Sequence, residues 1–440
     1  MGIRKKVIGV AAASALTLSG LVAMATPASA QVITSCGTHV MLPATLANDL
    51  NCTGTQYGLH ISASSGSGVL DLQGFTIDGN GELNNTRNEY VGIHIEGARN
   101  VIVQNGTVTG FDAGVAITKG SRNQVVNVTA HDNVNHSSLN SSPAAESNRC
   151  RFGDGIVVTN SNNNVIKNNR VFRNGPFDGI GLVGNSDNNI VSRNSVYDQN
   201  VANELSNGDN GPCGPFSAGP TGAGRLYQDI GIRVEGPGAN GNQVLANNVT
   251  DNQLNGISIH GYVCFVGNGG ISPPGAPAVG MPNTNNLIQG NNVRRNGFQP
   301  DGAVIDGIGI LRQGPFGNIT CASNSNSIIA NTSVYNARDG IFVPPTGDPA
   351  IAANNTIDKN IVRNNRRDGI RVEGPFTGIL GQYPGSNNNT LRNNQGTGNG
   401  EHDGHDGNPN CDANFWQQNI FGTVNQACVR ANGGSGVVTP

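Results

Sequence analysis

Short aliphatic pairs separated by polar residues recur along nearly the whole chain, and asparagine marks their spacing. An Asn stands at positions i, i+5 and i+10, and short aliphatic strands fill the gaps, as in Val165-Ile166. Gaps of this length predict strands of three to five residues whose side chains alternate between two faces. Full copies begin at Asn164, Asn242, Asn286, Asn326, Asn355 and Asn389, and partial copies at Asn100 and Asn189.

A second pattern follows the asparagine runs: an acidic or amide residue, then Gly, then Ile. Together the two patterns read as three strands separated by turns, and the shortest copies span 23–25 residues. Strands this short are unstable as isolated hairpins, but stacked copies let each strand pair with its equivalent one rung along. The steps stand at residues 154–156, 178–180, 255–257, 306–308, 339–341 and 368–370, with variants at 92–93, 114–115 and 231–232.

The repeat therefore predicts an all-β solenoid, a single-stranded parallel β-helix of about nine to eleven rungs. Unequal insertions argue against a left-handed hexapeptide helix. We expect residues 66–400 to form the solenoid, residues 31–65 to cap its first rung and residues 401–440 to form a C-terminal cap and tail. Stacked Asn side chains should hydrogen-bond from rung to rung, and Asn and Gly should supply left-handed turn residues. The inward aliphatic ladder would contain Ile93, Val115, Ile156, Ile180, Ile232, Ile257, Ile308, Ile341 and Ile370.

The composition agrees with this fold and excludes others. Gly contributes 63 residues and Asn 64, more than a quarter of the chain, while 12% of the residues are charged. Both types are poor helix formers, which excludes a largely helical protein, and Gly lacks the period of three that collagen requires. A net charge of -3 and recurring aliphatic pairs argue against disorder.

Residues 1–30 read as a secretory signal peptide. Arg4, Lys5 and Lys6 precede an apolar stretch, and residues 28–30 form a small-residue cleavage site. Cleavage would leave 23 basic against 29 acidic residues, which argues against a nucleic-acid partner. No later apolar stretch approaches the length of a membrane span. We therefore predict a secreted, extracellular, monomeric protein.

All eight cysteines follow the signal peptide, and an even number in an exported chain predicts disulfides. None lies in a Cys-x-x-Cys pair, so a cysteine-based zinc site has little support. Two predicted pairs close the terminal segments, and two brace insertions on either side of one strand. The pairs are Cys36–Cys52, Cys411–Cys428, Cys150–Cys213 and Cys264–Cys321.

On its asparagine runs and Asp-Gly-Ile steps, the stretch 66–400 resembles the right-handed parallel β-helix repeat proteins, which include the NosD-like and pectate-lyase-like superfamily. The resemblance implies a right-handed helix. It also implies an extracellular polysaccharide as partner, because the superfamily contains lyases, polygalacturonases and uronate epimerases beside phage tailspikes and non-catalytic members. The Asp-Pro-His triplet of alginate epimerases and the Gly-His-Gly and Arg-Ile-Lys motifs of polygalacturonases are missing. No catalytic residue therefore carries over.

Aligning the rungs on the inward isoleucine places two columns of side chains on the outer face of one strand. Arg233, Glu235 and His260 fall on consecutive rungs, Arg312 lies within one residue of the second column, and Tyr262 shares the face of His260. Long insertions at 134–152, 199–228, 262–285 and 313–325 bracket this strand and would form the walls of a cleft. The first column reads His94, Ala116, Val157, Gly181, Arg233, Ser258, Gly309, Phe342, Arg371; the second reads Glu96, Thr118, Thr159, Val183, Glu235, His260, Leu311, Pro344, Glu373.

This patch predicts a lyase or epimerase that acts on a uronate-containing polysaccharide. His260 or Tyr262 would be the base or proton donor, and Arg233 and Arg312 would stabilise the developing charge. A hydrolase would need two carboxylates about 5–9 Å apart. Glu235, also a catalytic candidate, has no carboxylate partner in the aligned columns, which makes hydrolysis the less favoured reaction.

Arg371, Glu373 and Tyr227 are expected to bind substrate. The sequence GIRVEGPF around Arg371 nearly repeats GIRVEGPG around Arg233, which also suits a shared structural use. Glu235 and Arg233 would then form a surface ion pair worth under about 1 kcal/mol. The alternative function is a non-catalytic glycan-binding, surface-binding or structural β-helix protein.

Three further features are interpreted as structural. The recurring Asp before Gly is predicted to cap backbone amides in turns, with Asp154, Asp178 and Asp306 as minor catalytic candidates. The run EHDGHDG at 401–407 is interpreted as a structural calcium site or an exposed polar loop rather than a catalytic metal site. Trp416 is predicted to pack in the C-terminal cap.

Overall fold

The structure is a computed structural model, and the parts of the chain that it describes cover most of the predicted solenoid. Residues 1–28 of the predicted signal peptide, Tyr227, Tyr262 and four cysteines (Cys150, Cys213, Cys264 and Cys321) lie outside the described residues, as do the side chains of His260 and Arg312. The described residues are 29–81, 90–134, 154–175, 178–199, 230–236, 238–261, 265–266, 270–271, 283–298, 305–312, 323–344, 353–378 and 381–440.

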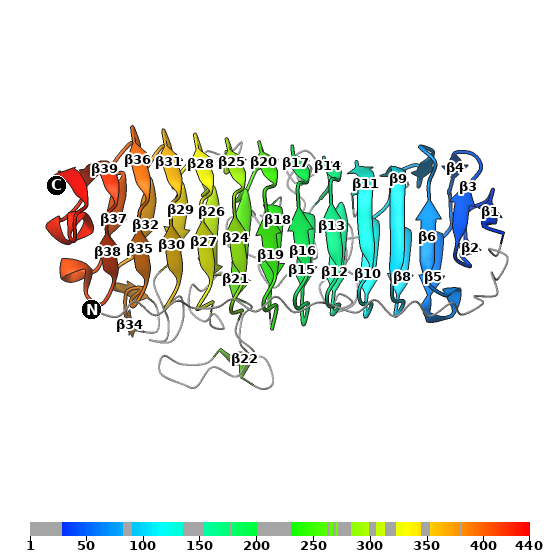
Figure 1. The fold of residues 1–440 in the computed structure, drawn as a ribbon, viewed down its shortest axis with the longest axis horizontal. Coiled ribbons are helices and arrows are strands. Elements are labelled where there is room, and N and C mark those ends of the chain that lie inside the picture. Colours follow the sequence, from blue (N-terminus) through cyan, green and yellow to red (C-terminus); the bar gives the residue numbers. More distant parts are fainter. Residues whose placement is uncertain are drawn as a thin grey trace, which may run out of the picture.

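Three stacks of short parallel strands form an elongated right-handed β-helix, as the repeat predicted (Figure 1). The stacks are named A, B and C in the order in which each turn of the chain runs through them. Strands β9 (Val101–Thr109) and β11 (Gln124–His131) are long enough to run through both stack B and stack C. Stack A, which carries the candidate site, contains β2 (Thr38–His39), β5 (Tyr57–Ser62), β8 (Val91–Glu96), β10 (Ala113–Thr118), β12 (Ile156–Thr159), β15 (Asp178–Val183), β18 (Ile230–Glu235), β21 (Ile257–Gly261), β26 (Ile308–Arg312), β29 (Ile341–Val343), β32 (Ile370–Val372) and β37 (Gly404–Asp406).

The other two stacks follow stack A in each turn of the chain. Stack B contains β1 (Gln31–Ile33), β3 (Ala44–Leu46), β6 (Gly68–Asp71), β13 (Val165–Lys167), β16 (Ile190–Ser192), β19 (Gln243–Leu245), β24 (Leu287–Gln289), β27 (Ser327–Ile329), β30 (Thr356–Asp358), β35 (Thr390–Arg392) and β38 (Phe415–Gln417). Stack C contains β4 (Leu50–Asn51), β7 (Thr76–Asp78), β14 (Arg170–Phe172), β17 (Ser195–Tyr197), β20 (Asn248–Thr250), β25 (Asn292–Arg294), β28 (Thr332–Val334), β31 (Ile361–Arg363), β36 (Gln395–Thr397), β39 (Ile420–Val424) and β40 (Ser435–Val438).

A few short elements stand apart from the stacks. Two antiparallel hairpins pair β22 (Phe265–Val266) with β23 (Gly270–Ile271) and β33 (Phe376–Gly378) with β34 (Gly381–Tyr383). The 3-10 turns are η1 (Ala63–Ser65), η4 (Pro409–Cys411) and η5 (Ala427–Arg430). In the described part of the chain, no helix has the length and apolar character that a membrane crossing requires.

The interior of the solenoid is aliphatic, and the predicted ladder on stack A is confirmed. Ile232 on β18 pairs with Ile180 on one side and Ile257 on the other, and all three side chains are fully buried. A glycine precedes each of these isoleucines because the backbone of the next rung leaves no room for a side chain there. A Cβ on Gly231 would lie 2.5 Å from the carbonyl oxygen of Gly256 on the next rung. Adjacent rungs can approach this closely only where that side chain is missing.

The asparagines at five-residue steps form hydrogen-bonded ladders in the turns, which confirms the second half of the pattern. The Nδ2 of Asn247 donates to Oδ1 of Asn291 at 3.0 Å and to the carbonyl of Val191 at 2.9 Å. Its own Oδ1 accepts from the backbone N–H and the Nδ2 of Asn194. Each side chain therefore satisfies buried backbone groups of the rungs on both sides.

Asn and Gly supply most of the left-handed residues of the described chain, as expected, but the ladder asparagines themselves do not adopt this conformation. That conformation belongs to the residue immediately before each of them, where Arg, Lys, Ala and Tyr occur beside Asn and Gly, as in Arg193, Ala246 and Lys359. The ladder position keeps Asn because its side chain bonds the buried backbone. The left-handed position points outward and accepts other types at a modest strain.

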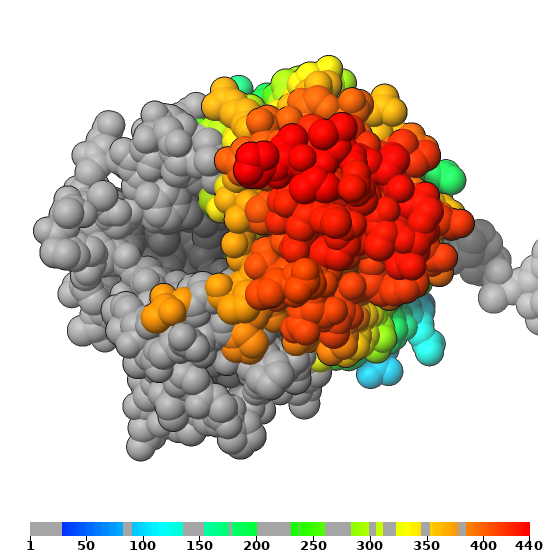
Figure 2. Space-filling model, turned by 90° about the vertical axis from the view of Figure 1, so that its left-hand side faces the viewer, coloured from blue at the N-terminus to red at the C-terminus, as the bar shows by residue number. Residues whose placement is uncertain are grey.

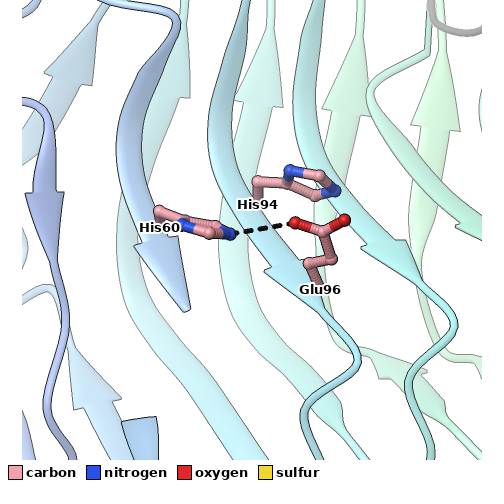
Figure 3. A group of neighbouring side chains, drawn as sticks. All are labelled: His60, His94 and Glu96. Carbon is pink, nitrogen blue, oxygen red and sulfur yellow. Dashed lines mark hydrogen bonds and ion pairs between the residues drawn. The ribbon is translucent and has the colours of Figure 1, made fainter. Parts of the chain in front are cut away.

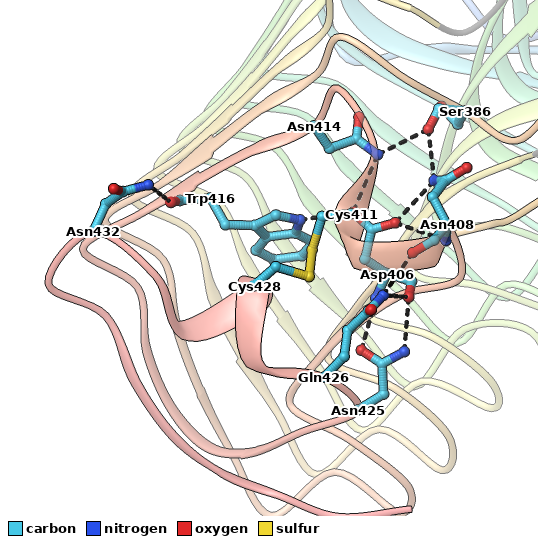
Figure 4. Close-up of a disulfide and its surroundings, with 10 residues drawn as sticks. All are labelled: Ser386, Asp406, Asn408, Cys411, Asn414, Trp416, Asn425, Gln426, Cys428 and Asn432. Carbon is cyan, nitrogen blue, oxygen red and sulfur yellow. Dashed lines mark hydrogen bonds between the residues drawn. A yellow bond between two sulfur atoms is a disulfide. The ribbon is translucent and has the colours of Figure 1, made fainter.

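Both ends of the solenoid are closed by a disulfide, as predicted, through the pairs Cys36–Cys52 and Cys411–Cys428. At the C-terminal end, Trp416 is buried, and its Nε1 donates to Oδ2 of Asp406 at 2.7 Å (Figure 4). Figure 2 shows the C-terminal residues covering this end of the molecule. The stacks also include the strands of residues 31–65, so the rungs begin before residue 66.

Candidate functional site

The predicted patch lies on three neighbouring strands of stack A. Glu235 on β18 pairs with His260 on β21, and His260 pairs with Leu311 on β26. Arg312 pairs with Gly261, so it stands one residue beyond the column of Glu235 and His260. The structure thus brings together the backbones of Glu235 and His260 and places Arg312 beside them out of register. Tyr262 and Tyr227 are not among the described residues.

Arg233 is the centre of a buried ion-pair cluster, not part of a surface ion pair as expected. Its side chain is 6% exposed; its Nε lies 2.6 Å from Oδ2 of Asp178, and its Nη1 lies 2.6 Å from Oε2 of Glu235. Burial alone would lower the pKa of Arg233, but the carboxylates of Asp178, Glu235 and Asp154 outweigh it and raise that pKa above its usual range. A guanidinium is well suited to this position because it stays charged when buried and binds two carboxylates at once.

Asp178 and Asp154 occupy paired positions on neighbouring rungs and form a carboxyl pair. Burial raises the pKa of Asp178 well above its ordinary value, and repulsion from Asp154 and Glu235 adds to this, against the attraction of Arg233. A Cβ at Gly181 would lie 3.0 Å from Oδ1 of Asp154 and 3.1 Å from Oδ2 of Asp178. The missing side chain of Gly181 therefore makes room for the two carboxyl groups, whose proximity disfavours charge on both at once.

The cluster corrects the argument against hydrolysis. Glu235 does have carboxylate neighbours, since Arg233 joins it to Asp178. The column alignment missed them because Asp178 lies three positions before Gly181, the residue that pairs with Arg233. The signal was present in the Asp-Gly-Ile steps, where Asp154 and Asp178 were minor candidates beside the long insertions. Their repetition along the chain concealed it.

The second copy of the motif forms a similar but more exposed cluster. Arg371 on β32 bonds Glu373 through its Nε at 2.7 Å and Asp368 through its Nη1 at 2.8 Å. The Glu373 side chain is 28% exposed, against 8% for Glu235. β32 is the fourth strand after β18 in stack A, so the two clusters are about 19 Å apart and do not share one site. The near-repetition of GIRVEGP reflects this common ion-pair geometry.

Other Asp residues of the Asp-Gly-Ile steps serve the turns, as predicted. Oδ1 of Asp306 accepts from the N–H of Asp339, and Oδ1 of Asp339 accepts from the N–H of Asp368. Asp306 also binds Arg338, and Asp339 binds Arg367. Burial raises the pKa of Asp306 to about 6, although the hydrogen bond from Arg338 opposes the shift.

The run at 401–407 is built into the C-terminal end of the solenoid. Asp403 accepts from the N–H groups of Gly422 and Thr423, and Asp406 accepts from Trp416. Burial raises the pKa of Asp406, while the hydrogen bonds from Trp416 and Asn408 oppose the shift. Both carboxylates therefore have structural partners, which makes the exposed-loop interpretation wrong for them.

A separate groove lies at the turn that follows stack C. Its volume is about 580 Å³, and its walls include the exposed rings of Phe298 and Tyr335. The guanidinium of Arg366 stacks over the Phe298 ring at 4.4 Å, and Arg295 pairs with Asp251. Exposed rings beside arginines can bind a sugar ring or an anionic group. Sequence reasoning missed this groove because its residues come from four different rungs.

The chain belongs to the right handed beta helix family, whose model matches residues 47–268, half of the chain. Among curated proteins, none matches it. Solved structures that are similar to it include the catalytic domain of a GH87 alpha-1,3-glucanase in complex with tetrasaccharides, at 15% identity and a TM-score of 0.52, covering 84% of this chain and 60% of that one. This chain thus spans less than two thirds of the glucanase chain.

Two further solved structures are also similar to it. The A-module of the Azotobacter vinelandii mannuronan C-5 epimerase AlgE4 is 13% identical with a TM-score of 0.44, covering 93% of this chain and 90% of that one. PfbA, a surface adhesin of Streptococcus pneumoniae, is 11% identical with a TM-score of 0.41, covering 89% and 76%. At identities this low, a likeness to solved structures shows the fold alone.

Proposed function

We propose that this chain is a secreted enzyme that acts on an extracellular polysaccharide at the cluster of Asp154, Asp178, Arg233 and Glu235. The single observation that carries the proposal is the buried Arg233 with carboxylates on both sides. Clusters in which neighbouring carboxyl groups have different pKa values, so that one is ionised and another protonated, are typical of acid–base sites. Secretion is supported by the predicted signal peptide and by the two terminal disulfides.

Glycoside hydrolysis is the reaction that the cluster fits best. It needs an ionised carboxylate and a second carboxyl group that keeps a proton. Glu235 pairs with Arg233, and its carboxylate is the most exposed of the three in the cluster. It is therefore the group proposed to contact the glycan. The Asp154–Asp178 pair lies behind it, and the raised pKa of Asp178 favours the protonated carboxyl group that the reaction needs. The glucanase structure supports this choice only in showing that the same fold can bind an oligosaccharide.

A lyase or epimerase reaction differs from hydrolysis in the catalytic groups that it requires and in its products. It would use His260 as base or donor beside Glu235 and a free cation for the substrate carboxylate. Arg233 is poorly suited to be that cation because Asp178 and Glu235 already neutralise it. Arg312, beside His260 on β26, would then take this role.

The experiment incubates the mature protein with a panel of neutral and uronate-containing polysaccharides. New reducing ends without ultraviolet absorbance of an unsaturated product indicate hydrolysis, both signals together indicate a lyase, and a changed uronate ratio without either indicates an epimerase. Glu235→Gln should lower the rate at least a hundredfold, roughly the loss expected when an acid–base group is removed. Asp339→Asn is the matched control, because Asp339 is also a buried carboxylate bound to an arginine, and it lies three rungs away.

Non-catalytic glycan binding is the second candidate function, and the groove of Phe298 and Tyr335 favours it. If every polysaccharide remains unchanged while Tyr335→Ala weakens retention on a glycan column and Glu235→Gln does not, the protein is a binding module. Activity that survives Glu235→Gln would reject the proposed site even if the protein proves to be an enzyme.

A further inference from the structure

We propose that His60, His94 and Glu96 form a binding site for a divalent transition metal ion such as Zn²⁺, on the outer face of stack A near its N-terminal end. One ligand atom from each of the three side chains lies within 4.8 Å of the other two (Figure 3). Nε2 of His60 lies 3.2 Å from Oε2 of Glu96. This site is independent of the proposed function.

The β-helix itself brings these three side chains together. His60 on β5 pairs directly with His94 on β8, so both rings leave the same face of adjacent strands. Glu96 follows His94 by two residues, which returns its side chain to that face. The sequence separation between His60 and His94 conceals the cluster, since only the register of β5 against β8 makes the two histidines neighbours.

The separations suit a metal ion of zinc's size. Ligand atoms about 2.1 Å from a tetrahedral ion are about 3.4 Å from one another. The His60–Glu96 separation of 3.2 Å is close to that value. The other ligand atoms lie within 4.8 Å of one another, so rotation of the side chains is enough to bring all three to bonding distance of one ion. Two imidazoles and one carboxylate are a common ligand set for zinc, with the fourth position left for water or a substrate oxygen.

Neighbouring side chains orient the ligands. Oγ1 of Thr118 lies 2.8 Å from Nε2 of His94, and the ring of Tyr57 stacks on His60 with centroids 5.0 Å apart. Partners of this kind hold ligand histidines in one orientation and strengthen metal binding. The Glu96 side chain is 50% exposed and that of His60 24%, so an ion can reach the site from solvent.

The local charge also favours a cation here, in contrast to the second histidine cluster. Asp368, His402 and His405 lie equally close together, but Arg371 places its Nη1 2.8 Å from Oδ2 of Asp368. A guanidinium already fills the place of a metal ion there. Within the described parts of the chain, the ion-pair partner of Glu96 is His60, and no arginine or lysine pairs with it.

Zinc titration of the untagged, metal-stripped mature protein, followed by calorimetry, tests the proposal. The wild-type chain should bind one Zn²⁺ at this site, and Glu96→Gln and His60→Asn should each weaken that binding at least tenfold. Both side chains are accessible, so these variants should fold; circular dichroism checks this. His405→Asn is the matched control and should leave the affinity unchanged.

A second readout reports the coordination itself. Co²⁺ added in place of Zn²⁺ should give visible absorption bands of a four- or five-coordinate site in the wild type, and these should be lost in Glu96→Gln. The proposal is overturned if zinc does not bind, if Glu96→Gln and His60→Asn bind it as the wild type does, or if His405→Asn abolishes the binding.

Discussion

Asp178 and Arg233 form a buried ion pair across neighbouring strands of stack A, with Nε of Arg233 2.6 Å from Oδ2 of Asp178. The same guanidinium holds Glu235 at 2.6 Å. Charge is expensive to bury unless it is paired, so this cluster persists only because each member neutralises another. It follows that the cluster should respond to substitution far more strongly than the exposed ion pairs of the solenoid.

Replacement of Arg233 by methionine should destabilise the protein strongly. The variant leaves Asp178 and Glu235 buried without their cation, which should lower the free energy of unfolding by about 3–5 kcal/mol. Arg173→Met is the control, since Arg173 pairs with Asp132 on the exposed surface and should cost under about 1 kcal/mol. Urea denaturation measures both. Equal effects of the two substitutions would show that the Arg233 pairs are not buried in solution.

Gly181→Ala should separate activity from stability. The added methyl group would stand 3.0–3.1 Å from Asp154 and Asp178, so the carboxyl groups must shift by a few tenths of an ångström. Displacements of this order impair acid–base sites, and we expect at least a tenfold loss of rate with a stability change under about 1 kcal/mol.

The control for Gly181 is Gly179 on the same strand. A Cβ there would lie 2.5 Å from Cγ1 of Val196 and 2.7 Å from the carbonyl oxygen of Gly231, so Gly179→Ala should unfold the protein at a markedly lower temperature. Thermal denaturation and the glycan assay should therefore rank the two variants in opposite order. A Gly181→Ala enzyme with the wild-type rate would argue against the acid pair.

Two adjacent asparagines should differ sharply in their contribution to stability. Asn247 makes ladder hydrogen bonds to both neighbouring rungs, and Asn247→Ala leaves buried backbone groups without partners, at a cost of roughly 3–5 kcal/mol. The side chain of Asn248 is exposed, and within the described structure its hydrogen-bond partner is Asn292. Asn248→Ala should cost under about 1 kcal/mol. Chemical denaturation of the pair tests whether the buried ladder stabilises the solenoid.

His405 should contribute to the loss of stability in acid. Burial lowers the pKa of His405 to about 4, with Arg371 and His402 adding to the shift. Between about pH 6.5 and 4 the unfolded chain therefore binds more protons at this position, so stability falls as the pH falls through that window. His405→Gln should lose less stability over the same range, by at most about 3 kcal/mol. Denaturation at pH 7 and pH 4.5 measures the difference, and an NMR titration with an ordinary His405 pKa would contradict it.

The architecture was predictable because every rung repeats the same requirements. The inward position of Ile232, the glycine before it and the buried asparagine Asn247 each recur with fixed spacing, so the repeat determines strands, turns and stacking together. The exception was the left-handed turn residue, as at Ala246. There the backbone sets the conformation and the outward side chain is nearly unconstrained, so Arg, Lys and Ala occur beside Asn and Gly and residue type alone does not identify the position.

The sequence by itself therefore determined the β-helix, its aliphatic interior, its terminal disulfides and the pairing of Glu235 with His260. Only the tertiary structure decided which polar groups are buried together, because that depends on register between strands and on where each side chain reaches. The register brings His60 beside His94, and the long Arg233 side chain reaches back to Asp178. The repeat made the fold predictable from the sequence. Because similar polar residues occur on many rungs, the same repeat gave no distinct signal for the few that the stacking brings into contact.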